Sequence, residues 1–304
     1  MKELVDIVRA WERRRGQQFA LATVVRVQGS SYRRPGARML ICADGASVGS
    51  LSGGCLEEEV AECARGVMRT GKPTVMEFDT RRRFGCNGVI EILVEALEEK
   101  FLIELADSFR LRRSCRAASN IRLGTRMLAH DETAPVDELL QEISPPLQLI
   151  IFGDGPDSVP LRSMAEILGW QVLETERAED LPIATDDRTA AVVKSHNYGR
   201  DFTALQRLLQ SNLRYVGLLG PRKRRDQLLG DLLDIGVSIQ AELFAPAGLD
   251  LRAETPEEIA LAIVSEIQTV FADASGDSLR DSKTPIHGWN VAPVRANECA
   301  ASAQ

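Results

Sequence analysis

Residue types that often reveal a function are scarce in this chain. Only three of the 304 residues are histidines, at 130, 196 and 287, and no HExxH motif is present, so a histidine-rich metal site is not expected. The six cysteines form no CxxC pair, which argues against a disulfide framework and a four-cysteine zinc site. No window approaches the roughly 18 apolar residues that span a bilayer, and the charged start contains no signal-peptide apolar stretch. We therefore expect reduced thiols, a cytoplasmic location and no membrane partner.

The balance of charge argues against a nucleic-acid-binding protein. Lys and Arg number 37 against 44 Asp and Glu, and the net charge of −7 is unlike that of a nucleic-acid binder held by counterion release. Hydrophobic residues make up 44% and charged residues 27%, as in ordinary globular proteins, so wholesale disorder is not expected. At roughly 100 to 200 residues per domain, the length favours two domains.

The first half of the chain has the pattern of a β-rich α+β domain. Apolar residues at helical spacing predict an opening helix, and a second helix follows Leu56. Asp44-Gly45 is a hairpin signal between two short strands. Strands are expected over 19–28, 38–43, 74–78 and 89–97, and the later part is expected to hold a helix around 101–109, a short β segment and a helix around 136–143.

The second half alternates strand-like and helix-like stretches. Ser144-Pro145-Pro146 breaks the preceding pattern and predicts a domain boundary near 145. The alternation beyond it indicates a parallel sheet covered by helices. Thr255-Pro256-Glu257-Glu258 combines an N-cap, a proline at the first helical position and a capping-box glutamate. We expect an α/β protein with an N-terminal domain over 1–144, a Rossmann-like domain over 145–273 and a mobile tail over 274–304.

The most specific local motif is Ser52-Gly53-Gly54-Cys55. Its two glycines permit close approach of backbone, and the dipole of the helix that follows favours the thiolate of Cys55, which is a soft ligand or a nucleophile. Cys86 lies in a second glycine-containing loop, Gly85-Cys86-Asn87-Gly88. For either cysteine the alternative is a small buried residue beside a tight turn.

Two groups of basic residues are candidate sites for a phosphate. Arg33, Arg34 and Arg38 flank Pro35-Gly36 in the first domain. Arg222-Lys223-Arg224 opens a predicted helix directly after the glycine-bearing strand end at Gly220. Each group either binds an anion or forms a solvated basic surface, and the residues alone leave both interpretations open.

Gly153-Asp154-Gly155 joins an apolar strand to a predicted helix, as in dinucleotide sites, where loop amides and a helix dipole face a phosphate. The pattern is incomplete, because Ser158 replaces the third glycine of GxGxxG and Asp154 and Asp157 place carboxylates beside the pyrophosphate position. In a parallel sheet the carboxyl ends of neighbouring strands share one edge, so we expect Gly153, His196 and Gly220 to be neighbours. A lone histidine otherwise has a structural role.

With these motifs the sequence resembles the XdhC/CoxI family, the accessory proteins of xanthine dehydrogenase and related molybdenum hydroxylases. The likeness covers most of residues 1–272. The matching segments are 29–39, 52–57, the Cys86 loop, the Gly153 loop, 195–198 with Asp201, 215–220, 248–250 and 255–260.

The resemblance implies a chaperone for molybdenum cofactor, in its molybdopterin or cytidine dinucleotide form. Such a protein shields the cofactor while a cysteine desulfurase installs the sulfido ligand, and then delivers it to the apoenzyme of a molybdenum hydroxylase, so no catalytic residues are expected. Cys55 is the first candidate metal ligand and Cys86 the second, because thiolates suit a transition metal. The candidate cofactor-binding residues are Arg33, Arg38, Ser52, Gly53, Gly54, Cys55, Cys86, Gly153, Gly155, His196, Gly220 and Arg222.

The chain departs from the family pattern at two positions, and alternatives stay open. Asn87 stands where the family usually has glycine, and Pro156 stands where many members have histidine. The second hypothesis is an NAD(P)-dependent oxidoreductase with a redox-active Cys55, and the third is an interaction scaffold whose cofactor sites have decayed. A nucleotide in the Rossmann-like domain and a homodimer are further expectations to be tested.

Overall fold

The computed structural model describes residues 1–29, 31–79, 88–129, 131–133, 135, 138–182 and 185–281. Its contacts divide the chain into two compact units. The N-terminal unit is built mainly from Asp6–Ser108 and Ser114–Ile143, and the C-terminal unit from Ser144–Asp277 together with Met1–Val5 and Phe109–Arg113. The unit break at Ile143 and Ser144 lies next to the domain boundary expected from Ser144-Pro145-Pro146.

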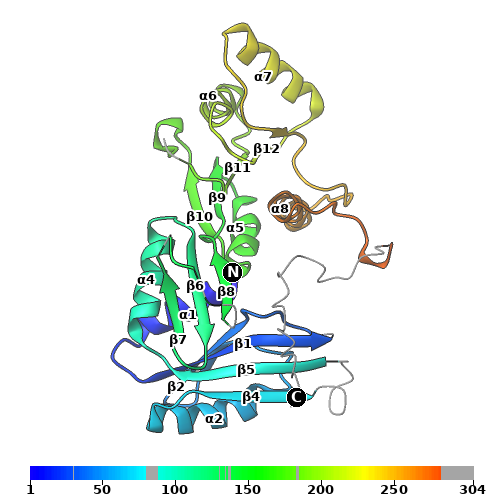
Figure 1. Cartoon of the computed structure of the whole chain (residues 1–304). Helices are drawn as coiled ribbons and strands as arrows, with labels where there is room; N and C mark the ends of the chain where they lie inside the picture. The colour runs from blue at the N-terminus through cyan, green and yellow to red at the C-terminus, as the bar shows by residue number, and fades with distance from the viewer. Residues whose placement is uncertain are drawn as a thin grey trace, which may run out of the picture. The chain divides into compact units, whose positions relative to one another are not determined.

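The N-terminal unit contains a five-stranded antiparallel sheet of order β3-β2-β1-β5-β4 (Figure 1). Helix α2 (Glu57–Thr70) packs on it through Val60, Ala64 and Val67, which share one helical face and lie in the same core cluster as the sheet residues. Gly71 ends α2 in the left-handed conformation, with φ of 67°. The strands are β1 (Phe19–Gly29), β2 (Arg38–Cys42), β3 (Ser47–Gly49), β4 (Thr74–Asp79) and β5 (Gly88–Ala96).

A smaller sheet in the same unit corrects one expectation. The helix expected around 136–143 was wrong over its described part, because Leu139–Ile143 is strand β8 and pairs antiparallel with β6 (Cys115–Asn120). Exposure along β8 alternates from residue to residue, and pairing with β6 outweighs the helical preference of Leu, Gln and Glu. β7 (Gly124–Leu128) is the third strand of this sheet, and two further described helices of this part of the chain are α1 (Lys2–Arg13) and α4 (Glu99–Arg110).

The C-terminal unit is a Rossmann-like α/β fold, as the sequence predicted. Its five strands are all parallel in the order β10-β9-β11-β12-β13. One face of the sheet shares a core with α6 and α7, and the other face with α5 and α8 (Figure 1). The elements are β9 (Gln148–Phe152), α5 (Ser158–Ile167), β10 (Gln171–Thr175), η1 (Ala178–Asp180), β11 (Thr189–Val193), α6 (Tyr198–Leu208), β12 (Tyr215–Leu218), α7 (Arg222–Asp234), β13 (Leu243–Phe244) and α8 (Pro256–Ala272).

Local signals at the end of this unit are also confirmed. The capping box predicted at the start of α8 is formed, with Thr255 accepting from the Glu258 amide and Glu258 accepting from the Thr255 amide. Of the tail expected over 274–304, the structure describes only the part up to Asp281, which includes the short helix η2 (Leu279–Asp281). Among the described residues, no helix combines the length and apolar character needed to cross a membrane.

Candidate functional site

The Ser52-Gly53-Gly54-Cys55 loop is organised by the carboxylate of Glu57. One carboxylate oxygen, Oε1, accepts hydrogen bonds from the amides of Leu51 (3.1 Å) and Ser52 (2.8 Å) and from the hydroxyl of Ser50 (2.9 Å). The other, Oε2, accepts from the Ser52 hydroxyl (2.7 Å) and the Leu56 amide (3.0 Å). Burial would raise the pKa of Glu57, but hydrogen bonds from Ser52, Ser50 and the backbone outweigh it and lower the pKa to about 2.

The hydroxyl of Ser52 completes this network from inside the loop. Its Oγ accepts from the amides of Gly54 (3.2 Å), Cys55 (3.0 Å) and Leu56 (3.2 Å). The amides before α2 are therefore already directed at Ser52 and Glu57. The loop therefore presents the Cys55 side chain and open space to a ligand, while the amides of Gly54, Cys55 and Leu56 are already used.

Cys55 is exposed at the rim of this loop. The positions where Cβ atoms would stand on Gly53 and Gly54 have no other atom within 4 Å, so the space above both glycines is open. Gly54 has φ of 108°, a conformation that glycine adopts without strain. Cys63 differs from Cys55, because it is half-buried on α2 and burial raises the pKa of its thiol. An exposed thiol beside open space is a suitable ligand for a transition metal.

The two candidate arginines of the first domain lie in different surroundings. Arg33 is partly exposed. Arg38 is fully buried on β2, where its guanidinium donates to the Gly36 carbonyl (3.3 Å) and the Gln141 side chain and lies over the Phe101 ring at 5.7 Å. Burial lowers the pKa of Arg38 to about 10, against the opposing charge of Glu95. The structure thus makes Arg38 a core residue that holds β8 against the sheet, and its burial argues against direct contact with a cofactor.

Cys86, the second candidate ligand, lies outside the described residues. Among those that are described, no three or more His, Cys, Asp or Glu side chains gather into a group that could hold a metal ion. A metal at Cys55 would therefore need further ligands from a bound molecule or from residues outside the described ranges.

The second candidate site is the carboxyl edge of the parallel sheet. Gly153 follows β9, His196 follows β11 and Gly220 follows β12, and these three strands are neighbours. The residues therefore lie along one edge, as expected. A Cβ on Gly153, whose φ is 120°, would stand 2.7 Å from the backbone of Ser195, so only glycine permits this approach of the two loops.

Lys194 is the functional candidate that the sequence reasoning missed. It directly follows the buried strand β11, its side chain is only 2% exposed, and its ammonium group donates to the Asp154 carbonyl (2.7 Å) and the Asp157 carboxylate (2.9 Å). The other Asp157 oxygen lies 3.6 Å from Nε2 of His196, whose side chain is exposed. The backbone of His196 has a φ of 55° at this strand end. A lysine directly after the apolar run 190–193 was the available signal.

This edge of the sheet also contains a buried ion pair and two exposed cations. Asp201, fully buried on α6, accepts from the Ser195 amide (3.1 Å) and hydroxyl (2.5 Å) and pairs with Arg224. At the start of α7, Arg222 and Lys223 are exposed, and within the described part of the chain neither has a hydrogen-bond or ion-pair partner. Because the first turn of α7 contains no acidic residue, Gly220 to Lys223 is the cationic end of the sheet edge.

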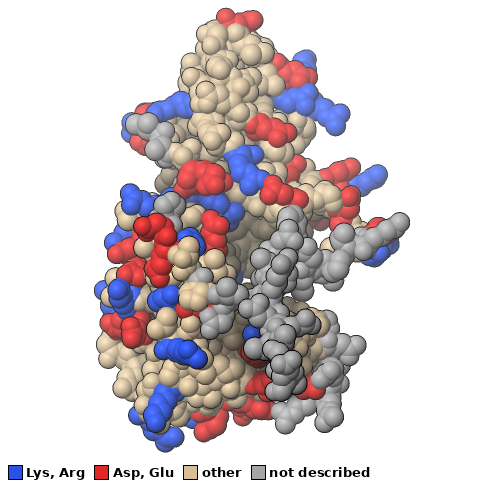
Figure 2. Space-filling view, in the orientation of Figure 1, with Lys and Arg blue, Asp and Glu red and all other residues tan. Residues whose placement is uncertain are grey.

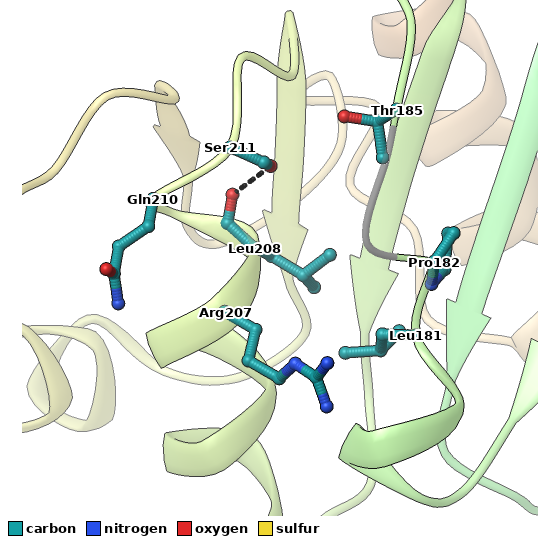
Figure 3. Close-up of a pocket in the computed structure, with 7 residues that line it drawn as sticks. All are labelled: Leu181, Pro182, Thr185, Arg207, Leu208, Gln210 and Ser211. Atoms are coloured by element: carbon teal, nitrogen blue, oxygen red, sulfur yellow. Dashed lines mark hydrogen bonds between the residues drawn. The ribbon is translucent and has the colours of Figure 1, made fainter.

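A pocket of about 230 Å³ lies elsewhere in the C-terminal unit and is lined in part by Arg207 and Leu208, at the carboxyl end of α6 (Figure 3). Its lining includes Leu208, whose carbonyl accepts from the Ser211 hydroxyl at 2.6 Å, and Arg207, which donates to the Ala178 carbonyl at 2.6 Å. None of the predicted site residues lines it. On the face shown in Figure 2, acidic and basic side chains are interspersed.

Comparisons with known proteins agree on one family. The sequence model of the XdhC and CoxI family matches residues 12–79, and that of the XdhC Rossmann domain matches residues 149–267. The first range includes the Cys55 loop, and the second includes Gly153, Lys194, His196 and Gly220.

Individual relatives cover most of the chain. A protein of Bacillus subtilis described as a probable subunit of xanthine dehydrogenase is 29% identical over 310 residues, covering 83% of this chain and 92% of the relative. A molybdenum cofactor insertion chaperone, PaoD, of Escherichia coli is 24% identical, with 86% of each chain covered. A crystal structure described as a xanthine dehydrogenase from Bacillus halodurans aligns with a TM-score of 0.74 and 25% identity over 92% of this chain and 98% of that one.

Proposed function

This chain belongs to the XdhC and CoxI family, and from that premise we propose that it is an accessory protein that binds molybdenum cofactor and inserts it into a xanthine dehydrogenase-type molybdenum hydroxylase. The observation that carries the proposal is the exposed Cys55 thiol on a loop that Glu57 and Ser52 hold in place. The similarity to a named insertion chaperone supports the same role.

The residues present at the Cys55 loop fit such a cofactor. A thiolate is a soft donor for a transition metal, and the open space above Gly53 and Gly54 leaves room for a bulky ligand next to it. We infer that Cys55 ligates the metal and that Ser52, through its bonds to three amides, keeps the thiol at the rim of the loop. When bound, the group supplies a molybdenum centre whose terminal ligand is exchanged before delivery.

The sheet edge of the C-terminal unit is a separate candidate site for a phosphate group. Exposed Arg222 and the α7 N-terminus at Gly220 offer positive charge, while Gly153, Gly155 and His196 line the neighbouring strand ends. Arg33 is a further candidate cation, and Cys86 remains a candidate second ligand. The ligand is either molybdopterin or its cytidine dinucleotide form, and the two forms would use different sets of these contacts.

The partners in this proposal are the apoenzyme of a molybdenum hydroxylase and a cysteine desulfurase, acting in the cytoplasm. The chaperone holds the cofactor while the desulfurase replaces its terminal ligand, and it has no catalytic residues of its own in that exchange. A homodimer is a further part of the proposal, and the mass in solution by light scattering decides whether one forms.

The test is to incubate the purified protein with molybdenum cofactor under anaerobic conditions, separate it on a gel-filtration column and measure the co-eluting pterin by fluorescence. We expect about one pterin per binding-competent chain. Parallel titration with NAD and NADP tests the oxidoreductase hypothesis, which the Rossmann-like sheet favours. Tight nicotinamide binding without pterin retention would replace the chaperone proposal with that second function.

A further inference from the structure

The helix that follows the Gly153 loop has no backbone amide to spare for a phosphate. In its first turn the Ser158 amide donates to the Gly155 carbonyl (3.1 Å), and the Val159 amide donates to the Pro156 carbonyl (3.3 Å). The next residue, Pro160, has no N–H. The first three residues of α5 therefore offer no free amide, unlike the helix N-termini that hold the pyrophosphate of a dinucleotide.

The Asp157 side chain at the start of this helix pairs with a lysine instead of capping the helix. Asp157 is the N-cap residue of α5, yet it makes no capping hydrogen bond. Its carboxylate instead accepts from Lys194 at 2.9 Å. The same oxygen lies 2.9 Å from the position of a Cβ on Gly155, so the carboxylate covers the second glycine of the motif. In dinucleotide sites this glycine is the point where the backbone approaches the pyrophosphate.

Burial of Lys194 keeps the carboxylate in that position. An ammonium group with 2% of its side chain exposed is costly unless it is paired, and Asp157 is its carboxylate partner, while Asp154 contributes only a carbonyl. A diphosphate that approaches Gly155 would meet the charge of Asp157 and would have to separate it from Lys194.

We propose that Asp157 determines the specificity of this loop by filling, together with Lys194, the place of a pyrophosphate and so excluding diphosphates from it. This inference rests on the proposed function in one respect, namely that a ligand binds along this sheet edge. Phosphate groups are then directed to Gly220 and Arg222, and the Gly153 loop contacts an uncharged part of the ligand.

The test is calorimetric titration of the full chain with inorganic pyrophosphate. The wild-type protein binds weakly, and Asp157→Ser, which opens the space over Gly155 and frees the ammonium of Lys194, is expected to bind at least ten times more tightly. Asp157→Asn, a near-isosteric change, gives a smaller gain in the same direction. Adding Lys194→Met to Asp157→Ser is expected to abolish the gain.

Asp154→Ser is the matched control, because it removes the same charge three residues away and keeps the carbonyl that Lys194 uses. Its pyrophosphate affinity should stay within twofold of wild type. The proposal is overturned if both Asp157 variants bind no better than wild type, if Asp154→Ser gains as much, or if the gain persists without Lys194. Cofactor plays no part in this titration, so failure of the proposed function, seen in wild-type pterin retention, is a separate result.

Discussion

Replacing Glu57 with Gln should destabilise the N-terminal unit in a way that depends on pH. The substitution keeps the size of the side chain but removes the charge that accepts bonds from Ser50, Leu51, Ser52 and Leu56. It also replaces one carboxylate oxygen, which accepts hydrogen bonds, with an NH₂ group, which donates them. That NH₂ group would face the N–H and O–H donors that bind the oxygen in the wild type. Hydrogen bonds to a charged group are the stronger kind, so their loss exceeds that of an ordinary surface substitution.

The magnitude follows from the pKa of this carboxyl group. A pKa lowered from 4.5 to about 2 corresponds to roughly 3 kcal/mol of differential stabilisation. Glu57 is partly exposed, so solvent screening reduces the expected loss to about 2 kcal/mol at pH 7. For a unit of this size the melting temperature should fall by roughly 4 to 8 °C.

The pH dependence has a definite sign. Because the folded-state pKa of Glu57 is depressed, its contribution is fully present above the unfolded-state value near 4.5 and is lost as pH falls towards about 2. The difference between wild type and Glu57→Gln should therefore be constant from pH 7 to pH 5 and shrink steadily below that.

Thermal unfolding monitored by circular dichroism at several pH values measures this difference. Glu58→Gln is the matched control, because Glu58 is an exposed neighbour in the same helical turn, and it should melt within about 1 °C of wild type. Equal melting of Glu57→Gln and wild type at pH 7, or a deficit that stays undiminished at pH 3, would refute the reasoning.

Three further predictions, two of them with a control variant, test the assignments made above. Cys55→Ala should lose most of the retained pterin, while its free energy of unfolding stays within about 0.5 kcal/mol of the wild-type value. The control Cys63→Ala should keep the pterin. Full pterin retention by Cys55→Ala in the gel-filtration assay would show that Cys55 is not the ligand. Arg38→Ala should cost about 3 kcal/mol, since it breaks a buried charged cluster, and Arg33→Ala should leave urea unfolding unchanged; the reverse order would contradict the burial argument. Thr255→Ala removes the helix cap of α8 and should cost about 1 kcal/mol, measured by urea unfolding, and an unaltered midpoint would show that the capping box contributes nothing.

Features carried by neighbouring residues were predictable from the sequence. The alternation of strands and helices after 145, the capping box at Thr255 and the three strand ends at Gly153, His196 and Gly220 all follow from short-range patterns, and the structure has them where expected. The Ser52-to-Cys55 motif was recognised from the same kind of signal. Local periodicity and turn chemistry contain this information because they act over fewer than about ten residues.

Features that depend on distant partners were decided by the tertiary structure. Leu139–Ile143 forms a strand because β6 is available to pair with it, and Arg38 is buried because Gln141, about a hundred positions later, and the Phe101 ring enclose it. The pairing of Lys194 with Asp157 likewise joins two loops that are 37 positions apart in sequence order. The sequence alone placed a carboxylate near the glycine loop, but only the fold decides that a buried ammonium group holds it there, because the cost of burying a charge is set by all the atoms around it.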